Sequence, residues 1–123
     1  MTGAPPKPVY WVGSSLKDLC ACPDEVQDAV GYALFLAQEG KQQQHPAAKR
    51  LKGALHGLVE IIADHASSTY RAIYTAKVNA VYVLHVFQKK ATRGIATPKH
   101  ELDLIKARLQ WAQRHARGEV EEL

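Results

Sequence analysis

The sequence predicts an α+β domain built from a strand, two helices, three antiparallel strands and a C-terminal helix. Three observations support this fold class. Residues 26–37 carry apolar side chains at helical spacings, residues 58–87 form apolar runs separated by turn signals, and residues 98–116 return to the helical period. At 123 residues, the chain is long enough for one hydrophobic core.

The first half of the chain predicts one strand and two helices. The stretch "PVYWV" has the composition of a short strand, and "SLKDLCAC" is typical of a short helix capped by Ser14 or Ser15. A second helix is expected to begin near Pro23 and to end at Gly40. The polar run "KQQQHPAAKR" that follows is expected to be a loop.

The second half predicts the sheet. Its three strands are "LVEIIAD", "TYRAIYTA" and "NAVYVLHVFQ", with a turn at "HASS" and a hairpin at residues 77–79. Strict alternation along the third strand would place His85 on the same face as Val81 and Val83. Thr97 and Pro98 are suited to begin the last helix. We expect the helices to pack on one face of the sheet and to leave the other partly open.

These elements define the expected domain boundaries. Residues 8–117 should form a single domain, preceded by a flexible lead-in over 1–7 and followed by an acidic tail over 118–123. No apolar run approaches the ~18 residues that a membrane span requires, and the start of the chain lacks the pattern of a secretory signal. We therefore expect a cytoplasmic protein.

The net charge of +4 conceals a strong asymmetry. Residues 1–40 hold two basic and five acidic side chains, whereas residues 41–117 hold 14 basic and four acidic ones, a net charge of +10. A basic excess confined to one part of a small domain is typical of a surface that binds a polyanion. The alternative is an ordinary solvated, lysine-rich surface.

Cofactor and metal motifs are missing from the sequence. The two cysteines are one residue apart, a spacing that suits neither a structural disulfide nor a four-ligand zinc site. There is no HExxH, GxGxxG or GxxxxGK[ST] pattern. We expect neither a metal nor a cofactor.

Arg71 is the most informative candidate, because it lies inside an otherwise apolar strand, where an unpaired charge is costly. One explanation is an ion pair with Asp64 or Glu60 on the neighbouring strand. The other is an anionic ligand shared with Lys89 and Lys90, which end the next strand.

Further basic residues come from separate segments: Lys49, Arg50 and Lys52 before the sheet, and Arg93 after it. The first three, taken alone, are best explained as a solvated loop. Taken with Arg71, they converge on the sheet as cations that can stabilise the charge of a phosphorane without a metal. RNA supplies its own nucleophile, the 2′-hydroxyl, and a Lys or His can move the proton. His65, at a turn, is a candidate for that role or for RNA binding, whereas His85 is best explained as a hydrogen-bonded structural residue.

The stretches "LKGALHGLVEIIAD", "STYRAIYTA" and "AVYVLHVFQKKATRGIATPKHELDLIKAR" carry a family resemblance. Over residues 8–116 the sequence resembles the RelE/ParE superfamily of type II toxin–antitoxin toxins, specifically the phage-derived HigB-like branch. The resemblance implies a RelE-like (microbial RNase-like) fold and a small bacterial endoribonuclease, an mRNA interferase, that cleaves mRNA in the ribosomal A site without metal. The 2′-hydroxyl attacks the adjacent phosphate and leaves a 2′,3′-cyclic phosphate and a free 5′-hydroxyl.

Residue roles follow from the resemblance by position. Arg71 corresponds to the strand arginine that stabilises the transition state, and Lys89 and Lys90 correspond to electrostatic or general-acid groups. The residues before the sheet correspond to groups that hold RNA or act as base: Lys52, and less closely Lys49 or Arg50. The catalytic Tyr or His of several relatives has no evident counterpart after Lys90, so the acid and the base stay unassigned.

The resemblance also implies partners. These are mRNA, the ribosome and a cognate antitoxin, in this branch usually a helix-turn-helix DNA-binding protein, which together with the toxin forms a hetero-oligomer. Two alternatives stay open. One is a ParE-like toxin that inhibits DNA gyrase, and the other is a catalytically decayed module that binds RNA or protein.

Overall fold

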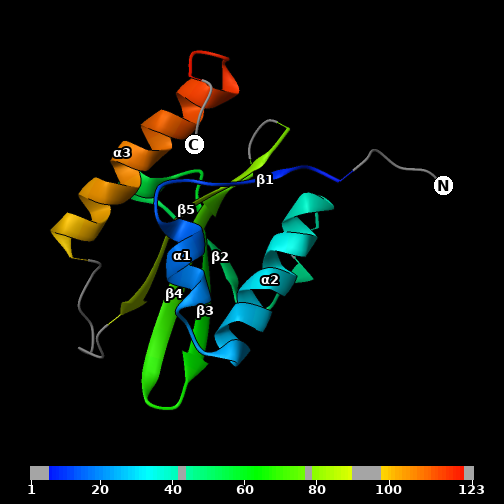
Figure 1. Ribbon diagram of the computed structural model, residues 1–123, viewed down its shortest axis with the longest axis vertical. Helices are drawn as coiled ribbons and strands as arrows, with labels where there is room; N and C mark the ends of the chain where they lie inside the picture. The colour runs from blue at the N-terminus through cyan, green and yellow to red at the C-terminus, as the bar shows by residue number, and fades with distance from the viewer. Residues whose placement is uncertain (1–5, 42–43, 77–78, 90–97, 121–123) are drawn as a thin grey trace.

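The computed structural model describes residues 6–41, 44–76, 79–89 and 98–120, and its centre is a five-stranded sheet of order β1-β5-β4-β3-β2 (Figure 1). The strands are β1 (Val9–Trp11), β2 (Ala48–Arg50), β3 (Val59–His65), β4 (Ser68–Thr75) and β5 (Val81–Lys89). The helices are α1 (Ser15–Cys20), α2 (Asp24–Gln38) and α3 (Lys99–Ala116), with a 3-10 turn, η2, at Gly53–Leu55. β1 runs parallel to β5, and the other neighbouring pairs are antiparallel. The predicted α+β class and order of elements are confirmed.

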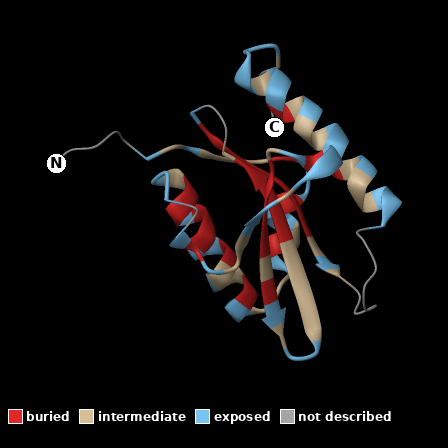
Figure 2. Ribbon diagram, turned by 180° about the vertical axis from the view of Figure 1, so that it is seen from behind, coloured by how far each residue is buried: buried red, intermediate tan, exposed pale blue. Residues whose placement is uncertain are grey.

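Helices cover both faces of the sheet, so the prediction that they pack on one face is wrong. α1 and α2 lie on one side, here called the α2 face, and α3 lies over β5 on the other, the α3 face (Figure 1). β5 explains the difference, because Val81 and Val83 join the core under α2 whereas Tyr82 and Leu84 join the core under α3. A strand buried on both faces has a continuous apolar sequence rather than an alternating one. Figure 2 shows this buried centre between helices whose outer surfaces are exposed.

β2 is a second correction, since the run "KQQQHPAAKR" was expected to be a loop. Its last three residues pair with β3, with Ala48 opposite Ile61 and Arg50 opposite Val59. Lys49 and Arg50 are exposed, so the segment carries almost no apolar signal. Pairing with the edge of β3 makes it a strand, an influence of tertiary contacts that local sequence does not record.

A β-bulge in β5 changes which side chains share a face. Ile73 pairs with His85, but the next residue, Tyr74, pairs with Val83, so Leu84 is the extra residue. Such a bulge reverses the alternation beyond it. His85 therefore lies on the α3 face, and the prediction that it shares a face with Val81 and Val83 is wrong.

The element ends agree closely with the expected turns. The "HASS" turn lies between His65 and Ser68, with Ala66 at a φ of 55°. α3 begins after Pro98, one residue later than expected, while Thr97 and residues 77–78 lie outside the described residues. Lys7, assigned to the lead-in, is already anchored, because its backbone N–H donates to the Gln38 carbonyl over 3.1 Å. Within the described ranges, no helix is long and apolar enough to cross a membrane.

Tyr74 lies in the core of the α2 face and is fully buried, and within the part of the chain that the structure describes its hydroxyl has no hydrogen-bond partner. Burial raises its pKa to about 12, against a small opposing effect of Arg50. The unfolded chain loses the proton of the Tyr74 hydroxyl near pH 10, whereas the folded protein keeps it until about pH 12. The contribution of Tyr74 to the free energy of unfolding is therefore fully present below pH 10 and is lost as the pH rises towards 12.

Replacing Tyr74 by phenylalanine should therefore raise the free energy of unfolding by about 1 kcal/mol, because an unsatisfied buried hydroxyl is removed. It should also make the loss of stability between pH 10 and 12 smaller. Urea unfolding at neutral and alkaline pH measures both effects. Tyr32→Phe, at a side chain that is 55% exposed, is the matched control and should change neither. An unchanged alkaline loss in Tyr74→Phe would contradict the assignment.

Candidate functional site

Arg71 is held in place by an ion pair. Its Nη1 donates to Oε2 of Glu60 over 2.7 Å, from β4 to the neighbouring β3. The two side chains are only 16% and 5% exposed, so the charges are largely withdrawn from water. The Arg71 Nε is buried and has no hydrogen-bond partner among the described residues. Of the two explanations for this arginine, an ion pair with Glu60 is therefore present, but it leaves part of the guanidinium unsatisfied.

Strand pairing brings two predicted lysines onto the same face as this pair. Lys49 on β2 is directly opposite Glu60, and Arg71 is directly opposite Phe87 on β5. Lys89 is opposite Thr69, two residues further along, so it is a diagonal neighbour of Arg71 at ~7–8 Å between Cα atoms. The bulge is responsible for the placement of Lys89, because strict alternation would have put it on the α2 face. Lys49, Glu60, Arg71 and Lys89 are called the strand site below.

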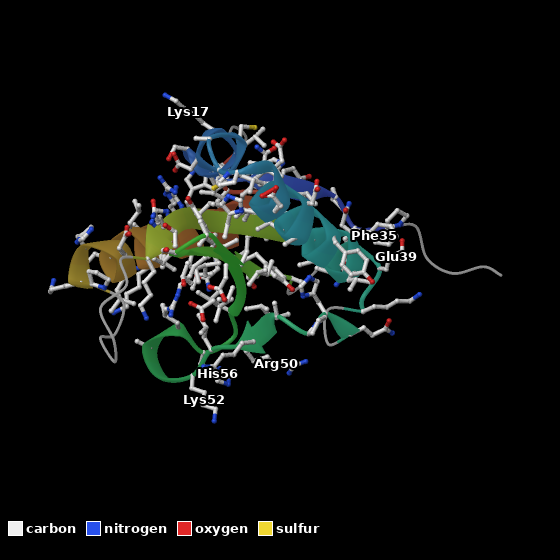
Figure 3. All side chains as sticks on the ribbon, turned by 90° about the horizontal axis from the view of Figure 1, so that it is seen from below. Lys17, Phe35, Glu39, Arg50, Lys52 and His56 are labelled. Atoms are coloured by element: carbon white, nitrogen blue, oxygen red, sulfur yellow. The ribbon has the colours of Figure 1, made fainter. Side chains whose placement is uncertain are left out.

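Arg50 and Lys52 lie at the other end of the sheet from Lys89. Arg50 is paired with Val59, and through it with Tyr74, roughly 17 Å along the strands from the Thr69–Lys89 pair. Both side chains are exposed, and Figure 3 shows them with His56 at one edge of the molecule, far from Lys17 on α1. Basic side chains are thus placed at both ends of the sheet, with Arg71 between them.

The remaining predicted residues are not brought to the strand site. His65 belongs to the α2 face, where its Nδ1 lies 2.7 Å from Oε2 of Glu25. Lys90 and Arg93 lie outside the described residues.

A buried polar cluster centred on His85 was not predicted as such. The His85 Nε2 lies 2.8 Å from Oε1 of Glu101, and its ring stacks on Phe87 with centroids 4.7 Å apart. Arg108 donates to the Leu84 carbonyl over 2.9 Å and approaches the His85 Nδ1 to 3.5 Å. Both ring nitrogens therefore have partners, as expected of a structural histidine. The cluster fastens α3 to β5, and only the fold reveals it, since its members are 16 and 23 residues apart.

Two hollows adjoin each other at the Arg50–Lys52 end. The first has a volume of about 270 Å³ and lies between the segment that follows η2, the strand ends and the last turns of α3. The second has a volume of about 390 Å³ and opens beside Arg50 and Lys52. They share the wall segment His56–Leu58.

The strand site can supply charge stabilisation. A guanidinium fixed by a carboxylate is pre-aligned for bidentate contact with phosphate oxygens, and flanking ammonium groups add positive charge. His65 is on the wrong face to assist it, and the nitrogens of His85 are already occupied.

Comparison with known proteins identifies the family. The family described as "Phage derived protein Gp49-like (DUF891)" matches residues 17–110, more than half of the chain. No curated protein shows a significant sequence match to the chain.

One similar solved structure is the toxin–antitoxin complex RelBE2 from Mycobacterium tuberculosis. It is 21% identical to the chain, with a TM-score of 0.44, and the alignment covers 68% of this chain and 92% of that one.

The Gp49-like match spans α2, the four strands β2 to β5 and most of α3, and so includes the strand site. It confirms the predicted resemblance to a phage-derived family. The chain therefore belongs to the phage-derived Gp49-like family.

Proposed function

We propose that the chain is the toxin of a type II toxin–antitoxin system and that it cleaves mRNA at the strand site without a metal ion. The observation that carries the proposal is the placement of Arg71, which is fixed by Glu60, with Lys89 diagonal to it on β5 and Lys49 opposite Glu60 on β2. A buried arginine with an unsatisfied nitrogen adds little stability to a fold, because a buried ion pair barely repays its desolvation. A role in binding an anion accounts for it.

The chemistry follows from these groups. The 2′-hydroxyl of the RNA attacks the adjacent phosphorus, and negative charge accumulates on the non-bridging oxygens, where Arg71 stabilises it. The bond from phosphorus to the 5′-oxygen then breaks, leaving a 2′,3′-cyclic phosphate and a 5′-hydroxyl. Glu60 positions Arg71, and Lys89 neutralises the leaving oxygen or the phosphate beside it. Lys52 lies with Arg50 at the other end of the sheet and holds the RNA there, so the proton of the 2′-hydroxyl passes to water.

Three further candidates are proposed as RNA contacts from the sequence: Lys90 and Arg93 as a continuation of the Lys89 end, and His65 at the adjoining turn. The partners proposed are mRNA on the ribosome and a helix-turn-helix antitoxin that forms a hetero-oligomer with the toxin in the bacterial cytoplasm. The basic excess of residues 41–117 supports a polyanionic substrate.

Induced expression in a bacterium without antitoxin tests the proposal. Growth should stop, and 5′-end mapping should reveal new 5′-hydroxyl ends inside reading frames. The double variant Lys49→Ala/Lys89→Ala should produce far fewer such ends, because it removes the two lysines of the strand site.

The matched control is Lys17→Ala/Lys106→Ala, which removes two exposed lysines from α1 and α3 and should cleave like the parent chain. Arrest with intact mRNA and gyrase-dependent DNA damage would instead establish the ParE-like alternative. Absence of arrest from the parent chain at normal protein levels would support the decayed module.

A further inference from the structure

The two adjoining hollows are not explained by the strand site. Their shared wall is His56–Leu58, and Thr75 in the first hollow is four residues from Arg71 on β4, about 13 Å away. The hollows are therefore separate from the position of the scissile phosphate but lie on the same strand.

The first hollow combines an apolar wall with hydrogen-bonding groups. Leu58, Tyr82, Leu109 and Ala112 supply the apolar and aromatic surface. The Tyr82 hydroxyl is already hydrogen-bonded to the His115 Nδ1 over 2.7 Å, so Tyr82 offers its ring rather than its polar group.

Four residues with polar side chains also line the first hollow: His56, Thr75, Gln113 and Arg117. The volume lies just below the range for small-ligand sites, about 300–1,000 Å³. A flat, partly polar group of limited size fits this description.

The positive charge of the residues that line the second hollow favours the binding of an anion there. Arg50 and Lys52 line it, and none of the described residues lining either hollow is acidic. The Arg117 guanidinium is offset by Glu119, with Nε to Oε2 at 2.6 Å, so the unbalanced positive charge is at the Arg50–Lys52 side. Figure 3 shows Arg50, Lys52 and His56 gathered at this edge.

We propose that the hollows form a nucleotide subsite, with the base in the first and its phosphate against Arg50 and Lys52 in the second. This inference rests on the proposed function in one respect, that the nucleotide is part of the RNA substrate. The base held there belongs to a nucleotide beside the cleaved bond rather than at it. The Gln113 amide, which can both donate and accept, gives the hollow a means of distinguishing bases.

Titration with the four nucleoside 5′-monophosphates, followed by amide NMR shifts, tests the subsite without requiring cleavage. Saturable shifts should appear at Leu109, Ala112 and Gln113, which line only the first hollow, and should differ in strength among the four bases. Inorganic phosphate at equal ionic strength should shift only residues near Arg50 and Lys52.

Ala116→Trp fills the first hollow from an exposed position on α3 and should remove the shifts caused by the bases. Ala107→Trp, an equal change at another exposed position of α3, should retain them. In RNA cleavage, Ala116→Trp should alter the base preference beside the cut while Ala107→Trp leaves it unchanged.

The proposed subsite would be contradicted if inorganic phosphate reproduced all of the NMR shifts caused by the nucleotides, or if those shifts persisted in Ala116→Trp. If nucleotides bind as described but no RNA is cut, the proposed nuclease fails and the subsite stands. If RNA is cut but nucleotides do not shift the amide NMR signals of residues lining the first hollow, only the proposed subsite is contradicted.

Discussion

Arg71→Lys is expected to lower the rate of RNA cleavage by on the order of 10²–10³-fold, the loss typical when one preorganised donor to a transition-state oxyanion is removed. Lysine keeps the positive charge but loses the planar fork that can bond Glu60 and a phosphate at the same time. The measurement is the cleavage rate of a defined RNA by purified protein at saturating and subsaturating substrate. The loss should fall mainly on kcat, because the interaction strengthens as charge develops.

The control for this prediction is Arg114→Lys, the same chemical change at an arginine of α3 that is 53% exposed. It should leave the rate unchanged. A normal rate for Arg71→Lys would show that charge alone, without the fork, is enough at this position. Circular dichroism of both variants establishes that each is folded before rates are compared.

Arg71→Ala is expected to lower the free energy of unfolding by about 3–5 kcal/mol, because the Glu60 carboxylate, 5% exposed, is left buried without a counter-ion. The double variant Arg71→Met/Glu60→Leu should be close to the parent chain or more stable, since no buried charge remains. Urea unfolding of the parent chain, Arg71→Met, Glu60→Leu and the double variant gives the coupling between the two residues.

The ion pair of Lys99 and Asp103 serves as a surface control for the Arg71–Glu60 pair, because its side chains are 88% and 57% exposed. Lys99→Ala should barely change stability, because exposed ion pairs contribute little. If the two single substitutions lower the free energy of unfolding by amounts that simply add in the double variant, Arg71 and Glu60 do not stabilise each other through their ion pair. A double variant that is stable but does not cleave RNA would separate the role of this pair in activity from its role in folding.

Periodicity in the sequence predicted most of the fold. The apolar spacings of residues 26–37 and 98–116 correspond to α2 and α3, and the turn signal at "HASS" corresponds to the turn after His65. These elements are marked locally by their caps, turns and apolar faces, which is why sequence alone predicts them. The two helical layers were missed, although the continuous apolar run of β5 is the signal that a strand is buried on both faces.

The candidate site was predicted in part. Arg71 stood out as a charge inside an apolar strand, and Glu60 was one of its two expected partners. The face of Lys89 depends on the bulge at Leu84, which is set by pairing with β4 rather than by residues near it in sequence. The same limit applies to the His85 cluster and to the hollows, both of which join α3 to segments far from it in the chain.

The most direct test of the central claim is the chemistry of the RNA ends that the purified protein produces, with and without ribosomes, in the presence of EDTA. The account predicts 2′,3′-cyclic phosphate and 5′-hydroxyl ends, formed at an undiminished rate in EDTA and lost in Arg71→Lys. Ends with a 5′-phosphate, cleavage that EDTA abolishes, or intact RNA with and without ribosomes would contradict it.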